Sequence, residues 1–169
     1  MKIENIIRRV LREQEENLSE LPPFDDFFDS DWNLVLNFMN RNPNKKFYHY
    51  GDLNLWDSNI ETLGKLVRVE GNLNLAFCQN LESLENLEYV GGYLNSAFCQ
   101  NLESLGNLEY VGDGLDLFDC ENLKSLGNLV RVGGYLSLKS TRLSKKYTEE
   151  EIRKMVEVVG QIYKTNYED

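Results

Sequence analysis

Two consecutive stretches of this chain read GNLNLAFCQNLESLENLEYVG (residues 71–91) and GYLNSAFCQNLESLGNLEYVG (residues 92–112). A third unit of the same length, DGLDLFDCENLKSLGNLVRVG, occupies residues 113–133. Residues 51–70 form a similar unit that is one residue shorter, and residues 134–143 begin a fifth. Units this short cannot bury an apolar face alone, but stacked copies bury it against each other. The repeat therefore predicts a solenoid.

Each unit opens with leucines at alternate positions, such as Leu73 and Leu75, which is the period of a half-buried strand. In the unit at residues 92–112, Ser96 replaces the second leucine. Apolar residues then follow at intervals of three, and in the unit at residues 71–91 they are Leu81, Leu84, Leu87 and Val90. This spacing favours a tight, partly 3₁₀ return path rather than a second full strand. We expect one parallel β-sheet on one face of a repeat solenoid.

The units, written G-x-L-x-L…N-L-x-S-L-x-N-L-x-x-V-G, resemble the leucine-rich-repeat family, and more closely the short repeats of bacterial and bacteriophage leucine-rich proteins. The resemblance covers residues 51–143. It departs from the family pattern because a second asparagine follows the Asn/Cys position and because no room is left for a convex helix. The resemblance implies a parallel sheet, a protein-binding role and no catalytic chemistry. It is consistent with a bacteriophage-encoded factor that acts in the host cytoplasm on a host protein, for example as an anti-defence factor.

The residues before the repeats, 1–50, predict a helical N-terminal cap. Five apolar residues have helical spacing near the start, namely Ile3, Ile6, Ile7, Val10 and Leu11. Pro22 and Pro23 end any continuation of that helix. Ser30 or Asp31 is placed to begin a second helix over residues 32–40, whose apolar side consists of Trp32, Val35, Leu36 and Met39.

The residues after the repeats, 144–169, predict a helical C-terminal cap with a last strand. Thr148 and Glu151 form a capping box, so residues 149–157 are expected to be helical. Ile152, Met155 and Val156 are expected to face inward. Residues 158–163 resemble the start of another repeat, and we expect a strand there. The whole chain is thus interpreted as a single domain.

The charge of the protein excludes several classes of function. The 169 residues include 28 acidic and 18 basic side chains, which gives a net charge of -10. Such a surface does not favour direct binding to nucleic acid or to anionic membranes. No stretch is long and apolar enough to span a membrane, and residues 1–16 do not resemble a secretory signal. We expect a cytoplasmic protein.

Chemistry at a metal or cofactor is not expected either. His49 is the single histidine, and no catalytic motif is present. Cys78, Cys99 and Cys120 recur at the repeat period, so they form a column instead of a tetrahedral ligand shell, and we interpret them as buried structural thiols. Asparagines form a similar column that we expect to satisfy backbone groups, and they are Asn59, Asn80, Asn101 and Asn122.

The residues between the strand leucines should form the outer face of the sheet, in three columns. The first column is Asp52, Asn72, Tyr93, Gly114 and Tyr135; the second is Asn54, Asn74, Asn95, Asp116 and Ser137; the third is Trp56, Ala76, Ala97, Phe118 and Lys139. The asparagines are either a ladder of stacked amides or part of a recognition face with aromatic anchors. The candidate partner-binding residues are Asn54, Trp56, Asn74, Tyr93, Asn95, Asp116, Phe118 and Tyr135.

Two functions fit these features. The first is a non-enzymatic protein–protein interaction module that binds another protein through the exposed sheet face. The alternative is an acidic decoy, a DNA mimic that occupies the basic cleft of a nucleic-acid-binding protein. Between Arg12 and Asp31, eight acidic residues stand against one basic residue, which favours such a charge-driven role. A decoy would depend steeply on salt and would tolerate changes in the aromatic columns. The sequence leaves the partner and the oligomeric state open.

Overall fold

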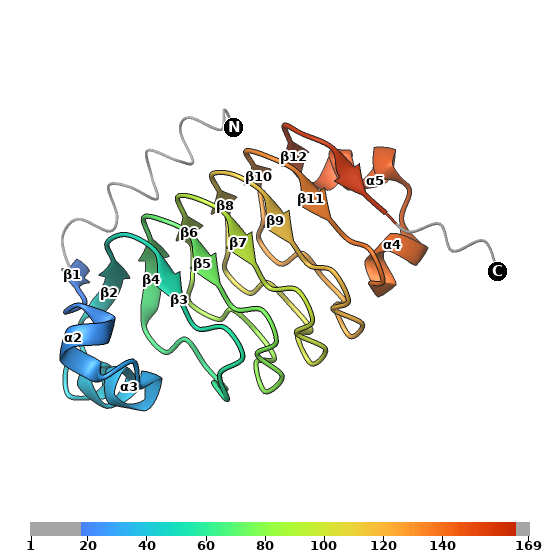
Figure 1. Ribbon diagram of the computed structural model, residues 1–169. Helices are drawn as coiled ribbons and strands as arrows, with labels where there is room; N and C mark the ends of the chain where they lie inside the picture. The colour runs from blue at the N-terminus through green and yellow to red at the C-terminus, as the bar shows by residue number, and fades with distance from the viewer. Residues whose placement is uncertain (1–17, 165–169) are drawn as a thin grey trace.

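The computed structural model describes residues 18–164, which form a parallel β-solenoid with two sheets (Figure 1). Sheet A has the order β1-β2-β4-β6-β8-β10-β12, and sheet B has the order β13-β11-β9-β7-β5-β3. Sheet A consists of β1 (Leu18–Glu20), β2 (Lys46–His49), β4 (Leu66–Val69), β6 (Tyr89–Val90), β8 (Tyr110–Val111), β10 (Arg131–Val132) and β12 (Glu157–Val158). Sheet B consists of β3 (Leu53–Asn54), β5 (Leu73–Asn74), β7 (Leu94–Asn95), β9 (Leu115–Asp116), β11 (Leu136–Ser137) and β13 (Ile162–Tyr163).

The register of sheet B follows the repeat, as the sequence predicts. Leu115 pairs with Leu94 on one side and with Leu136 on the other, and both pairings are parallel. Equivalent residues of successive units therefore lie side by side. This arrangement confirms the repeat solenoid.

Sheet A is a second sheet, whereas the sequence predicted only one. Its central strands lie on the return path, where no strand was expected. Val90 of β6 is buried while Tyr89 is half-buried, and the same alternation recurs at Tyr110 and Val111. A strand of two residues is too short to show this alternation in the sequence. The three-residue spacing of the leucines is the stronger pattern along the return path. Ser83, Ser104 and Ser125 add a further line of parallel bridges between the rungs. The return path is thus short strands joined by turns, rather than a 3₁₀ path.

A single core lies between the two sheets. Leu94 from sheet B, Val111 from sheet A and Leu105 from the turn between them are all fully buried. The cysteines belong to this core, since all three are free and buried. Each cysteine thiol donates to a carbonyl of the preceding rung: Cys78 to Leu55 at 3.1 Å, Cys99 to Leu75 at 3.0 Å and Cys120 to Ser96 at 3.1 Å. These contacts confirm that the cysteines are structural.

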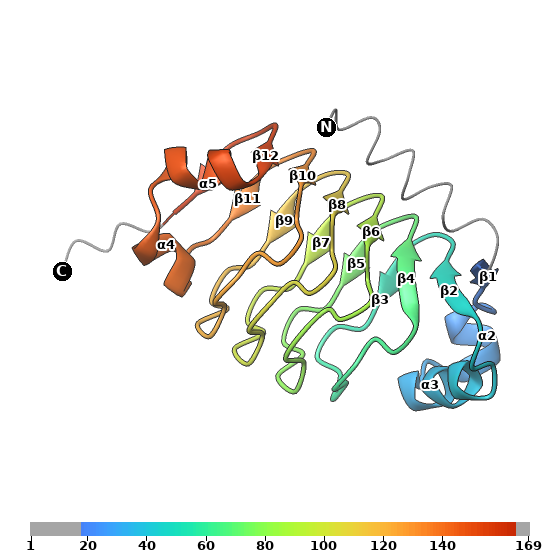
Figure 2. The same cartoon turned by 180° about the vertical axis from the view of Figure 1, so that it is seen from behind.

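The N-terminal cap contains helices and two strands. Helix α3 (Trp32–Asn40) has the predicted bounds, and Asp31 caps it by accepting the Asn33 amide at 2.8 Å. The Trp32 indole donates to the Thr62 carbonyl at 2.8 Å and so ties α3 to the first repeat. Figure 2 shows the N-terminal helices together at the end of the solenoid where β1 and β2 lie. A second helix, α2 (Phe24–Phe28), follows the prolines, and strands β1 and β2 extend sheet A beyond the repeats. The helix predicted from Ile3 to Leu11 lies outside the described residues.

The C-terminal cap has helices α4 (Arg142–Lys146) and α5 (Glu149–Met155). Thr148 and Glu151 form the predicted capping box. In place of the one strand predicted over residues 158–163, two short strands follow: β12 joins sheet A and β13 joins sheet B. Ile152 and Val156 are buried, but Met155 is 50% exposed, so its predicted inward position was wrong. Helix α5 ends at Met155 and Val156 is extended, which breaks the helical spacing on which that prediction relied. No helix within residues 18–164 is long and apolar enough to cross a membrane.

Candidate binding surface

The eight candidate residues lie on or beside the strands of sheet B, and none of their side chains is buried. They alternate with fully buried leucines, so they lie on the outer face of the sheet. Of the other positions in the three predicted columns, Asp52, Asn72 and Lys139 are exposed, but four are buried, namely Ala76, Ala97, Gly114 and Ser137. The outer face is therefore more closely packed than the strand period alone indicates.

The asparagine column has a local structural role. The side-chain oxygens of Asn54, Asn74 and Asn95 each accept the backbone amide two residues further on, at 3.2, 3.2 and 3.1 Å. Asp116 accepts the Phe118 amide in the same way at 2.9 Å. Such Asx turns satisfy the backbone where the strand ends, which explains why Asn and Asp occur here. The bonds occupy the side-chain oxygens, while the amide –NH₂ groups of the three asparagines have no hydrogen-bond partner within residues 18–164.

The first column ties one rung to the next. Asp52 accepts the Asn72 amide at 2.7 Å, and Asn72 accepts the Tyr93 amide at 2.8 Å. Both bonds cross from one repeat to its successor. These two side chains consequently hold the turns into the strands in place and are not free recognition groups.

Tyrosines converge over the second half of sheet B, where Gly114 leaves space. A Cβ atom at Gly114 would lie 2.7 Å from the Tyr135 ring, so the ring covers this glycine. The Tyr135 hydroxyl donates to the Tyr93 hydroxyl at 3.2 Å, and Tyr93 donates to Asp116 at 3.4 Å. Burial, followed by these two hydrogen bonds and the Asp116 charge, raises the pKa of Tyr93. The edge-on contact of Tyr135 with Tyr163, at 5.6 Å, completes this tyrosine cluster (Tyr93, Tyr135 and Tyr163).

An aromatic row, consisting of Trp56, Phe77, Phe98 and Phe118, crosses four rungs at the ends of the sheet B strands. The ring centroids are 6.2 Å apart from Trp56 to Phe77, 4.5 Å from Phe77 to Phe98 and 5.0 Å from Phe98 to Phe118. Trp56 is 56% exposed and Phe77 is 38% exposed. Sequence reasoning found the two ends of this row and missed Phe77 and Phe98, which connect them.

A pattern in the sequence identifies the two missed phenylalanines. The four rungs carry, in order, Trp56-Asp57, Ala76-Phe77, Ala97-Phe98 and Phe118-Asp119. Each pair contains one aromatic ring. An aromatic residue at the first position is followed by Asp, and an Ala at the first position is followed by Phe. Each rung thus contributes one ring to the row, although the position that supplies the ring changes.

Two of the clefts in the described part of the chain are relevant to the candidate functions. One has a volume of about 470 Å³, lies at the N-terminal end of the face and is lined by Glu20, Phe24, His49 and Asn54 among others. The nitrogen Nε2 of His49 is 3.0 Å from the backbone oxygen of Asp52. The other cleft, about 570 Å³, is lined by Glu61, Glu82, Glu85 and neutral polar residues. Within residues 18–164, His, Cys, Asp and Glu side chains form no group that would hold a metal ion.

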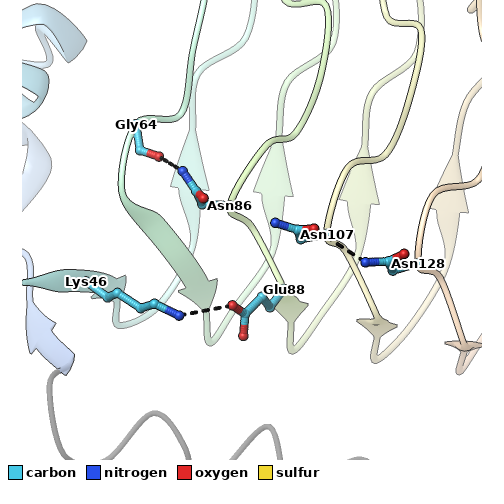
Figure 3. Close-up of polar contacts among 6 residues, drawn as sticks. All are labelled: Lys46, Gly64, Asn86, Glu88, Asn107 and Asn128. Carbon is cyan, nitrogen blue, oxygen red and sulfur yellow. Dashed lines mark hydrogen bonds and ion pairs between the residues drawn. The ribbon is translucent and has the colours of Figure 1, made fainter.

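The outer face of sheet A has a different character. Tyr89 stacks on Tyr110 with centroids 5.0 Å apart, and the Arg68 guanidinium lies 4.0 Å from the Tyr89 ring centroid. Ion pairs join Arg68 to Glu70 and Arg131 to Glu157. Figure 3 shows Lys46 reaching Glu88 at 3.3 Å, and Asn86 donating to the Gly64 carbonyl at 2.7 Å. This face is cross-linked along the solenoid by its own side chains.

Comparison of the chain with protein-family models, with curated proteins and with solved structures found no match.

Proposed function

We propose that this protein is a non-enzymatic binding module that recognises another protein through the outer face of sheet B. The aromatic row carries the proposal. Four rings in contact across four rungs form a continuous apolar strip, and Trp56 at its end is 56% exposed. Aromatic residues gain most from burial at an interface and dominate binding hot spots.

The chemistry around the row favours a protein over other partners. Phe77 and Phe98 are stacked on each other, 4.5 Å apart and inclined by 11°, so one face of each ring is closed to a stacking base. The net charge of -10 opposes contact with phosphates. The asparagine –NH₂ groups beside the row suit hydrogen bonds to carbonyl groups of a partner chain.

A capture experiment tests the proposal. The protein is immobilised, incubated with bacterial lysate at low and at high salt, and its bound proteins are quantified by mass spectrometry. Replacing Tyr93 and Phe118 with alanine should weaken partner binding by ~2 kcal/mol, because both rings belong to the proposed interface. Reversing Glu82 and Glu103 to lysine, on the return path, is the matched control and should change capture far less.

The acidic-decoy alternative predicts the opposite ranking. It is supported by the acidic cleft that Glu61, Glu82 and Glu85 line. A decoy would lose its partner in the Glu82→Lys, Glu103→Lys variant and at high salt, since screening weakens charge-driven association. It would keep its partner when Tyr93 and Phe118 are replaced.

A further inference from the structure

We propose that the partner contributes an amphipathic α-helix, which lies along the aromatic row and crosses the strands of sheet B. Its apolar stripe contacts the rings, and basic side chains approach Asp57 and Asp119. This inference rests on the proposed function and names the kind of element that the surface binds.

The spacing of the rings matches a helix. Centroid separations of 6.2, 4.5 and 5.0 Å lie on both sides of the helix pitch of about 5.4 Å. Side chains at i, i+3/i+4 and i+7 therefore meet successive rungs. In an extended strand, residues on one side are roughly 6.6–6.8 Å apart, and they fall out of step with rungs that lie roughly 4.8 Å apart.

The backbone at Phe77 and Phe98 shows that the turn itself does not require these rings. Their φ angles are 65° and 62°, in the left-handed region that bulky residues rarely occupy. The same position in other rungs has Asp57, Asp119 and Ser140, with φ of 53°, 60° and 57°. Because the turn forms with small polar residues, phenylalanine is not required for it. Strained positions of this kind are frequent at functional sites.

Carboxylates stand at both ends of the phenylalanine pair. Asp57 precedes Phe77 by one rung, and Asp119 follows Phe98 by one rung, since Phe77 pairs with Ala97 and Phe98 with Phe118 through the backbone. The rungs of Asp57 and Asp119 are three intervals apart, which is about 14 Å and corresponds to about ten residues of helix. A helix with an apolar stripe and basic residues about ten positions apart is therefore complementary in shape and in charge.

Synthetic peptides of leucine and lysine test this inference. Two labelled peptides of about 14 residues share one composition, but one has its leucines at helical spacing and the other alternates leucine with lysine. A third peptide repeats the helical pattern with alanine in place of leucine. Binding of each to the full chain is measured by fluorescence anisotropy. We expect the leucine peptide with helical spacing to bind at least tenfold more tightly than either of the others.

Protein variants locate the binding. Phe77→Ser with Phe98→Ser introduces the residue that the chain itself has at position 140, so the turn is preserved. This variant should bind the helical peptide at least tenfold more weakly. Tyr89→Ser with Tyr110→Ser removes two rings from the outer face of sheet A and should leave binding unchanged. Circular dichroism verifies that each variant is folded.

Three outcomes overturn the inference. They are equal binding of the alternating peptide, equal binding of the alanine peptide, and unchanged binding by the Phe77→Ser, Phe98→Ser variant. If the helical peptide fails while lysate capture still requires Tyr93 and Phe118, the face binds a protein by another element, and only the inference is lost. If capture is also indifferent to these rings, the proposed function is lost as well.

Discussion

The outer faces of the two sheets share one repeating backbone but use their side chains in different ways. On sheet A, Arg68 and Arg131 pair with glutamates, and Tyr89 lies between Arg68 and Tyr110. On sheet B, the aromatic row leaves Trp56 and Phe77 partly exposed. These arginines and tyrosines of sheet A are thus paired within the chain, whereas sheet B presents apolar ring surface to solvent.

This difference separates stabilisation from recognition. Contacts that link neighbouring rungs contribute to folding, because each rung is stable only when it is stacked on others. The rings of the aromatic row also link rungs, but the ring surface that stays exposed at Trp56 and Phe77 is stabilised only when a partner covers it. We therefore expect changes on sheet A to lower stability and changes on sheet B to lower binding.

The largest effect on stability is expected in the core that both faces share. Leu105→Ala should lower the free energy of unfolding by about 2–5 kcal/mol through lost burial and the cavity left behind. Chemical denaturation of the purified variant measures this. Partner capture, expressed per folded molecule, should not change. A loss below about 1 kcal/mol would show that this leucine column is not core.

A smaller effect is expected from the outer face of sheet A. Arg68→Ala removes the cation–π contact with Tyr89 and the ion pair with Glu70, and the Arg68 side chain is only 12% exposed. The free energy of unfolding should fall by about 1 kcal/mol while capture stays the same. Reduced capture at unchanged stability would mean that sheet A takes part in binding.

A stabilising effect is expected at Ser96, directly beneath the outer face of sheet B. Its hydroxyl is buried without a hydrogen-bond partner in the described part of the chain, at a position where the second repeat has Leu75. Ser96→Ala should raise the free energy of unfolding by about 1 kcal/mol, because it removes an unsatisfied polar group. Thermal denaturation measures the change, and a lower melting temperature would contradict it.

Ionisation of the buried cysteines should not change the free energy of unfolding at neutral pH, but it should lower it at alkaline pH. Burial raises the pKa of the Cys99 thiol from its ordinary value of 9.0 to about 12. Above pH 9 the unfolded chain therefore loses this proton while the native chain keeps it, so stability should fall as the pH rises from 9 towards 12. Denaturant titrations at pH 7, 9 and 10.5 measure the fall.

Cys99→Ser is the matched control, since the first repeat has Ser58 at the equivalent position, where the hydroxyl donates to the Leu55 carbonyl of its own rung at 2.7 Å. This variant should show a shallower loss of stability in alkali than the natural chain. Identical pH profiles would show that the Cys99 thiol does not contribute to the fall.

Much of the fold was predictable because it depends on period and on local capping. The repeat length, the bounds of α3 and the Thr148–Glu151 capping box can all be read from nearby residues. The second sheet could not be read in this way, since strands such as Tyr89–Val90 are too short to display a period. Their existence depends on stacking between repeats, which a single unit does not reveal.

The candidate site was predicted in outline and not in its packing. Strand alternation placed Tyr93, Tyr135 and Phe118 on one face. It did not show that Tyr135 covers Gly114, because that contact joins neighbouring rungs. It also missed Phe77 and Phe98, since the left-handed backbone at these residues breaks the alternation on which the prediction relied.

Capture by two matched double variants tests the central claim most directly. Tyr93→Ala with Phe118→Ala removes two rings from sheet B, and Tyr89→Ala with Tyr110→Ala removes two from sheet A. With equal amounts of folded protein and bacterial lysate at moderate salt, we predict that the sheet B variant retains ~30-fold less partner, which corresponds to ~2 kcal/mol. The sheet A variant should retain the partner at the level of the unmodified chain. Loss of the partner by the sheet A variant alone would contradict the assignment of the binding surface to sheet B.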